Sequence, residues 1–415
     1  MKRSLVSKTF LVLSVIALAS CGGQASSSSA ISSISSDDAL TALDSAFAAY
    51  FSHDSIGFNF SRHPDTIKNG KQSNDFSLTY TPVEKPTTPS SSEATTSASA
   101  LLAETSADSS AATDLDFSSP VTVGISGFAS DNFPANCYVN GLSDSLGSSL
   151  LAYLHLDYPT FTFAQGDDSP TRLSETALST YLDINALYLD LSKISFVSTL
   201  TSAIQQIPGN EKWEFPAGKR GKVALPSKVS SALSYFLPLQ RYLPSLGTAV
   251  VQSLRNDQKG TKSLGLAFSQ NEDGLTLNAT ISSFSKFYSL LVEWTKSMVA
   301  TKGTLLEQAA EYALIDDSVL KPIQKYGNCL STFSLSTSLV YRSTGLKQAS
   351  FILDGAADLA KLKTSYADSD ASGFVTAFHG AGVLDFVVDS DAAIPTPNPA
   401  LATYPEIPAI VYNPL

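Results

Sequence analysis

The amino-acid sequence predicts an α+β fold in which a large curved antiparallel β-sheet carries several helices packed on one face. Apolar and polar residues alternate in many short segments, for example over residues 121–125 and 332–341. Such alternation is typical of antiparallel strands with one face in water. Helical periodicity is confined to a few stretches, and the regular strand–helix–strand order of a parallel sheet is missing.

The N-terminal half of the predicted domain starts with a helix and continues with strands. Apolar residues recur at helical spacing over 39–51, after an acidic pair at 37–38 that suits a helix start. Asn69-Gly70 indicates a turn. A strand pair is predicted over 181–191. The single strands predicted in this half cover residues 56–60, 75–81, 121–125, 137–141, 150–156 and 159–163.

The C-terminal half alternates between helices and long strands. A hairpin is predicted from 263–269 and 275–281, because Asp273-Gly274 lies between two alternating runs. Gly380 and Gly382 are predicted to allow a bend or bulge. The helices predicted here cover 196–207, 229–254 with interruptions at Pro238 and Pro244, 284–300 and 305–315. The last strands cover 332–341, 349–354 and 373–388, the final one being a strand or a strand pair.

Composition divides the chain into four parts. Residues 1–20 are predicted to be a signal peptide, and residues 21–38 a Ser-rich disordered tether. A single α+β domain is expected over 39–394, with a flexible Pro-, Ser- and Thr-rich insertion at 82–113. Residues 395–415 form a Pro-rich tail that should run extended over the surface.

The first twenty-one residues have the layout of a secretory signal. Three cations precede an apolar run over 10–18 that is too short to span a bilayer, and Leu18-Ala19-Ser20-Cys21 closes the run. This ending resembles the lipobox of bacterial lipoproteins. The resemblance implies that Cys21 becomes the N-terminus, carries a covalent diacylglycerol group, and anchors an extracytoplasmic protein to the bacterial cell membrane. A plain secretory signal would instead leave Cys21 as an ordinary thiol.

The excess of acidic residues argues against two classes of binding partner, nucleic acids and anionic lipid surfaces. The chain has 27 Lys and Arg against 38 Asp and Glu, and the signal peptide contains three of the cations and none of the acids, so 24 cations remain. This acidic balance argues against a nucleic-acid partner, which is bound through clustered cations. It also argues against electrostatic attachment to anionic lipid. The lipid anchor is therefore the expected membrane contact.

Catalytic signatures are weak, so the protein is predicted not to be an enzyme. Ser-x-x-Lys at 283–286 and Ser-Asp-Asn at 130–132 occur in the reverse of the β-lactamase order, and Gly-x-Ser-x-Gly is absent. The four histidines show no metal-ligand spacing, so neither a metal nor another cofactor is expected. Cys137 and Cys329 either form a disulfide or remain two buried thiols.

Apolar side chains on one predicted helix and one predicted strand are candidates for a ligand cavity. They are Phe287, Leu291, Trp294 and Met298 on the helix, and Phe333 and Leu335 on the strand. The same pattern also suits a helix that only covers a core. The helix over 40–50 followed by the strand 56–60, together with the later strand pairs, resembles the lipoprotein-carrier (LolA-like) fold. That resemblance implies a half-barrel sheet whose helices enclose an apolar cavity for acyl chains.

Two functions of different classes follow from these observations. The first is a non-enzymatic, membrane-anchored lipoprotein that binds or carries an apolar, lipid-like ligand. The second is a surface adhesion or structural lipoprotein with a closed core and a protein or glycan partner. A hydrolase without a familiar motif is a weaker third hypothesis.

The lipid anchor gives a direct prediction. Replacing Cys21 by Ala removes the thiol to which the acyl group is attached, so labelled palmitate should no longer be incorporated and the protein should leave the membrane fraction. Cys137→Ala is the matched control and should keep both the label and the membrane association. Equal labelling of the Cys21→Ala chain would contradict the lipoprotein assignment.

Overall fold

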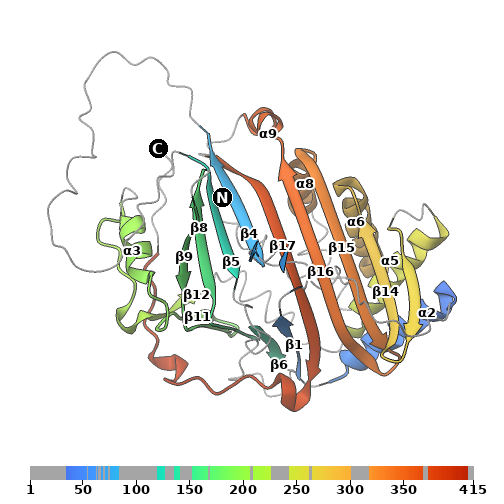
Figure 1. Cartoon of the computed structure of the whole chain (residues 1–415). Coiled ribbons are helices and arrows are strands. Elements are labelled where there is room, and N and C mark those ends of the chain that lie inside the picture. The colour runs from blue at the N-terminus through green and yellow to red at the C-terminus, as the bar shows by residue number, and fades with distance from the viewer. Residues whose placement is uncertain are drawn as a thin grey trace.

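A computed structural model gives the fold of this chain. It describes residues 34–53, 55–61, 63, 67–68, 71–72, 75–83, 119–126, 135–140, 152–166, 169–205, 209–225, 243–260, 264–300, 317–367 and 373–409. Within these residues the fold is α+β and is dominated by one antiparallel sheet that does not close into a barrel (Figure 1). The predicted fold class is confirmed at this level.

The sheet has fifteen strands among the described residues. Its main path runs β12-β11-β10-β7-β6-β1-β17-β16-β15-β14-β13, and a branch β4-β5-β8-β9 leaves it at β17. The strands of the main path are β1 (Ser55–Ser61), β6 (Ala135–Asn140), β7 (Ala152–Asp157), β10 (Ala177–Leu182), β11 (Ala186–Asp190), β12 (Arg220–Ala224), β13 (Ala267–Asn271), β14 (Gly274–Ile281), β15 (Leu330–Arg342), β16 (Gly345–Ala357) and β17 (Gly373–Val388). The branch contains β4 (Phe76–Pro82), β5 (Val121–Ser126), β8 (Thr160–Gln165) and β9 (Thr171–Ser174), and β2 (Ile67–Lys68) pairs with β3 (Lys71–Gln72) in a separate ribbon.

Strand β17 is the point at which the sheet divides. It is 16 residues long, whereas β1 and β4 have seven each. One part of β17, residues 373–380, pairs with β4, and residues 383–388 pair with β1. The segment predicted as a strand or a strand pair is thus a single strand. Its length allows it to pair with both β1 and β4 along the same edge.

The helices form a layer on one face of the strands β13 to β16 (Figure 1). Helix α2 (Ser36–Tyr50) packs directly on the sheet, and Leu40 and Leu43 are completely buried there. The Tyr341 hydroxyl on β15 donates a hydrogen bond to the Ala39 carbonyl at 2.9 Å. Burial of this hydroxyl raises the pKa of Tyr341 above its ordinary value, so the group stays neutral and keeps the hydrogen bond.

A second helix rests on the first. In α5 (Leu243–Lys259), Gly247 lies against the Phe47 side chain so closely that a Cβ at this position would overlap it. Thr248 donates to Asp44 at 2.9 Å, and Arg255 donates to Thr41 at 3.0 Å. Helix α5 is therefore positioned on α2. Helix α6 (Phe284–Ala300) packs beside α5 and reaches β14 and β15.

Three further α-helices lie within the described residues. They are α3 (Val197–Gln205), α8 (Asp317–Gly327) and α9 (Leu359–Ser365). None of the described helices is long and apolar enough to cross a membrane.

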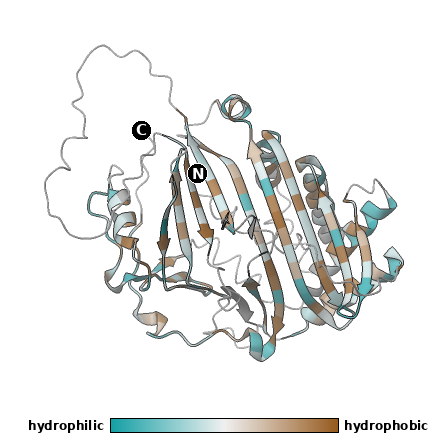
Figure 2. Ribbon diagram, in the orientation of Figure 1, coloured by the Kyte–Doolittle hydropathy of each residue, from teal (hydrophilic) through white to brown (hydrophobic). Residues whose placement is uncertain are grey.

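Side-chain alternation places the core under the helices. Apolar and polar residues alternate along the long strands, as Figure 2 shows. Leu335 of β15 lies opposite Leu353 of β16, and Leu339 lies opposite Ala349, on the face that the helices cover. Since every second residue of a strand faces the same way, this face is apolar over several neighbouring strands.

On the apolar face of the sheet, two glycines leave space for aromatic rings from neighbouring strands. Gly382 of β17 lies under the Phe60 ring, and a Cβ at this position would overlap the ring. Gly355 has the same relation to Phe378. Of the bend or bulge predicted at Gly380 and Gly382, the bulge is wrong: the β16–β17 register runs through both glycines without a shift, and the β17–β4 register shifts between Val375 and Ala377 instead. Contact with the Phe60 ring therefore accounts for the glycine at position 382.

Most predicted elements are confirmed, with changes at their ends. Helix α2 begins at Ser36, three residues earlier than predicted, because the Ser35 side chain accepts a hydrogen bond from the Asp38 amide as its N-cap. Strand β13 begins at Ala267, later than predicted. Pro244 lies in the first turn of α5, where its missing N–H costs no hydrogen bond, so it starts a helix rather than breaking one.

Several predictions fall where the structure gives no description. The helix at 305–315, the helix before residue 243, most of the insertion 82–113 and the signal and tether up to residue 33 lie outside the described residues. Helix α8, which contains Pro322, was not predicted. Residues 405–407 of the tail lie along the edge of β12, where the Ile407 amide donates to the Lys222 carbonyl at 2.8 Å.

The packing of Phe60 on Gly382 can be tested by substitution. Gly382→Ala should destabilise the fold by about 1–3 kcal/mol, because the added methyl group meets the ring in a filled core. Gly380→Ala is the matched control on the same face, where the nearest atom of the Phe76 ring is 3.1 Å from the new Cβ. Its loss should be smaller. Urea unfolding measures both, and equal stability of the two variants would contradict this packing.

Candidate functional site

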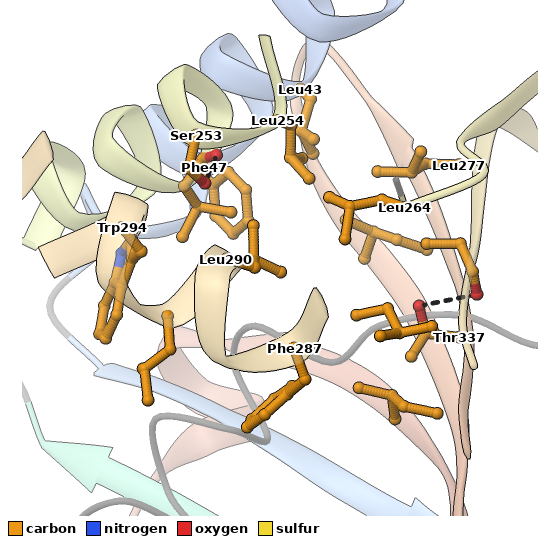
Figure 3. A pocket seen from close by; sticks show the side chains of 16 residues that line it. Leu43, Phe47, Ser253, Leu254, Leu264, Leu277, Phe287, Leu290, Trp294 and Thr337 are labelled. Atoms are coloured by element: carbon orange, nitrogen blue, oxygen red, sulfur yellow. Dashed lines mark hydrogen bonds between the residues drawn. The ribbon is translucent and has the colours of Figure 1, made fainter. Parts of the chain in front are cut away.

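An apolar cavity lies between the helix layer and the sheet (Figure 3). Its volume is about 50 Å³. It is lined by side chains from α2, α5, α6, β14 and β15 and from the segment before β13. The lining residues are Leu43, Phe47, Val250, Ser253, Leu254, Leu264, Leu277, Ala279, Ile281, Phe287, Leu290, Leu291, Trp294, Leu335, Thr337 and Leu339.

The helical wall follows from residue spacing. Phe287, Leu290, Leu291 and Trp294 are separated by the intervals that place side chains on one face of a helix, so α6 presents a continuous apolar stripe to the cavity. This stripe extends about 10 Å along the helix axis. Helices α2 and α5 contribute pairs at similar spacing, including Leu43 with Phe47 and Val250 with Leu254.

The sheet wall follows from strand register. On β14 and β15 every second residue faces the cavity, and these residues lie opposite one another across the ladder. The facing pairs are Leu277 with Leu339, Ala279 with Thr337, and Ile281 with Leu335. The two strands thus form a flat floor of six lining side chains.

The lining leaves no hydroxyl donor free for a ligand. Among the described lining residues, Ser253 and Thr337 carry the only hydroxyl groups, and none is ionisable. Ser253 donates to the Val250 carbonyl at 2.7 Å, and Thr337 donates to the Ala279 carbonyl at 3.4 Å. Both hydroxyls are therefore used within the protein. A charged ligand would lose its hydration here without finding a counter-ion.

Trp294 differs from the rest of the lining. Its side chain is 6% exposed, and its indole Nε1 atom is buried without a hydrogen-bond partner among the described residues. Trp213, the other tryptophan, donates its indole N–H to the Pro408 carbonyl at 2.8 Å. An unsatisfied buried donor costs on the order of 1–3 kcal/mol. Trp294 thus carries an unused donor beside an otherwise apolar space.

Four of the six predicted cavity residues line the cavity. They are Phe287, Leu291, Trp294 and Leu335. Phe333 does not: its ring packs against those of Phe284 and Phe287, with centroids 5.7 and 5.4 Å away. Met298 belongs to α6, but its side chain lies outside the described residues.

Most of the lining residues that sequence reasoning missed come from α2, α5 and β14, and the others are Leu264, Leu290, Thr337 and Leu339. Leu43 and Phe47 belong to a helix that was predicted, and their helical periodicity was visible. That this face would meet α6 depends on packing between segments more than 200 residues apart in the sequence. No local pattern carries this information.

Of the two alternatives for Cys137 and Cys329, the disulfide is not formed. Cys329 is a buried free thiol whose sulfur lies 3.4 Å from the Lys325 carbonyl oxygen. Cys137 belongs to β6, and β1, β17 and β16 separate that strand from β15, which starts next to Cys329. The alternative of two unpaired cysteines therefore applies to Cys329.

A Ser–His–Asp arrangement occurs elsewhere in the sheet. His155 Nδ1 lies 2.7 Å from the Ser179 hydroxyl, and His155 Nε2 lies 2.7 Å from the Asp157 carboxylate. Acyl transfer also needs backbone N–H groups free to stabilise an oxyanion. Here β7 and β10 each have a paired strand on both sides, so the nearby amides are used in the ladders. The arrangement suits a structural network better than a nucleophile.

A second polar cluster lies at the β11–β12 edge. Burial of Asp190 raises its pKa, but the hydrogen bonds from Arg220 and Ser192 outweigh this effect and hold the pKa below the ordinary value. Arg220 Nε donates to Asp190 at 2.8 Å. These groups satisfy one another, and the cluster ties two neighbouring strands together.

Among the described residues, no group of three or more His, Cys, Asp or Glu side chains could hold a metal ion. A comparison of the chain with protein-family models, curated proteins and solved structures finds no match. The geometry of the cavity is therefore the feature from which a function can be proposed.

Proposed function

We propose that the protein is a membrane-anchored extracytoplasmic lipoprotein that binds an apolar, lipid-like ligand between its helix layer and its sheet. The lining of the cavity carries this proposal: it is apolar, lacks an ionisable residue among the described ones, and uses both of its hydroxyls internally. Such a surface favours hydrocarbon over water, and it offers too few polar partners for a sugar and no counter-ion for an ion.

The proposed anchor and the cavity are close in sequence. Fourteen residues separate Cys21 from Ser36, where α2 begins. A chain of this length reaches at most about 50 Å when extended. Since α2 supplies Leu43 and Phe47 to the lining, acylation of Cys21 would hold the cavity within this range of the membrane, where acyl chains are available.

The arrangement also supports the resemblance to the lipoprotein-carrier (LolA-like) fold. An open antiparallel sheet has helices on one face, and an apolar space lies between the two layers. We propose this fold relationship on the architecture alone. It implies that helix movement controls access to the cavity.

The size of the cavity favours a second candidate function. About 50 Å³ is well below the roughly 300 Å³ at the lower end of small-molecule sites. A core this nearly filled also suits a surface adhesion or structural lipoprotein with a protein or glycan partner. The lipid-binding proposal requires α6 to move away from β14 and β15 when a ligand enters.

A cavity-filling substitution separates the two candidates. In the full chain carrying Cys21→Ser, which cannot be acylated there, native mass spectrometry should detect a non-covalently bound acyl lipid. Leu290→Phe places extra volume in the cavity and should lower the bound fraction several-fold. Ser289→Phe adds the same side chain at the exposed neighbouring position and is the matched control. A lipid-free mass for all three chains would contradict lipid binding and favour the second candidate.

A further inference from the structure

If the protein binds lipid as proposed above, the buried indole of Trp294 indicates the chemical class of that lipid. We infer that Trp294 donates its Nε1–H to a carbonyl oxygen of an uncharged acyl ester whose hydrocarbon chain occupies the cavity.

Three observations carry this inference. The Trp294 indole nitrogen is buried and has no partner among the described residues, while the side chain lines the cavity. The hydroxyls of Ser253 and Thr337 already donate to backbone carbonyls. Trp294 is therefore the side chain of the described lining with an unused donor. An indole N–H donates only, so its partner must supply an acceptor.

Trp294 lies where one end of a bound acyl chain would be expected. Trp294 lies on the far side of Leu290 from Leu264 and Leu277 in Figure 3, with the apolar stripe of α6 in between. The stripe from Phe287 to Trp294 spans about 10 Å. An acyl chain along this stripe would place its carbonyl oxygen at the indole and its methyl end near the sheet.

The charge of the ligand follows from the same lining. A carboxylate buried here would meet no cation among the described lining residues, and burying an unpaired charge is far more costly than burying a neutral ester. The ester keeps the carbonyl acceptor without the charge. This distinguishes an acyl ester from an ionised fatty acid and from a plain hydrocarbon.

Three probes of similar chain length test the inference: methyl decanoate, decanoate and n-dodecane, each titrated into the full chain carrying Cys21→Ser. Methyl decanoate should bind about twofold to tenfold more tightly than n-dodecane, which is the effect of one net hydrogen bond. Decanoate should bind more weakly than the ester at pH 7. In the Trp294→Phe chain the ratio of ester to hydrocarbon affinity should fall several-fold, to one or below, because the ester carbonyl is then buried without a donor. This ratio cancels the effect of the smaller ring.

A second readout needs no change at Trp294. The chain has two tryptophans, so ¹⁵N-labelled tryptophan gives two indole N–H resonances, and Trp213→Phe assigns them. Methyl decanoate should move the Trp294 resonance, whereas n-dodecane should move it much less. The Trp213 resonance is the internal control, because that indole is already bonded to Pro408.

The outcomes separate the two proposals. Equal affinity for ester and hydrocarbon, with a ratio unchanged by Trp294→Phe, overturns the role of Trp294 and leaves lipid binding intact. Failure of all three probes to bind overturns both. Tighter binding of decanoate than of the ester would overturn the preference for an uncharged ligand.

Discussion

The packing of α2 on β15 and β16 is the contact on which the rest of the helix layer depends. Leu40 and Leu43 are completely buried in it, and the Tyr341 hydroxyl fixes its level on the sheet through Ala39. Helix α5 is then seated on α2 through Gly247 and Phe47, and α6 packs on α5. The cavity lies where α5 and α6 approach the sheet without filling the space above β14 and β15, so it results from the order in which the helices rest on one another.

Local sequence patterns predicted much of this fold, because strand and helix periodicity depend on neighbouring residues. Most of the predicted strands and three of the helices are found close to their predicted positions. The division of the sheet at β17 could not be predicted, since Gly380 pairs with Phe76 from the other end of the chain. The cavity could be predicted only in part. The apolar face of α6 can be recognised from residue spacing within the helix, whereas the position of Leu43 beside it depends on how α2 packs in the folded protein.

The cavity wall contains a buried hydrogen-bond donor, the Trp294 indole, for which the described part of the chain supplies no acceptor. Many polar side chains beneath or between the strands find partners, as in the Asp190–Arg220 pair and the His155 network. Two atoms on the strands, Ser338 Oγ and His379 Nε2, are buried without a hydrogen-bond partner among the described residues, but neither residue lines the cavity. Trp294 is an exception at the cavity wall, with an unused donor whose burial opposes stability. The proposed ester ligand would satisfy this donor, and it would thereby connect the stability of the helix layer to the proposed function.

Hydrogen–deuterium exchange of the full chain tests the layered arrangement most directly. If α2 is the seated helix and α6 the one that moves to admit a ligand, the amides of α6 should exchange at least about tenfold faster than those of α2, because local opening exposes the less firmly held helix first. Methyl decanoate should slow exchange in α6 and leave α2 unchanged. Exchange in α2 that is as fast as in α6, or an α6 that does not respond to a bound ester, would contradict this account.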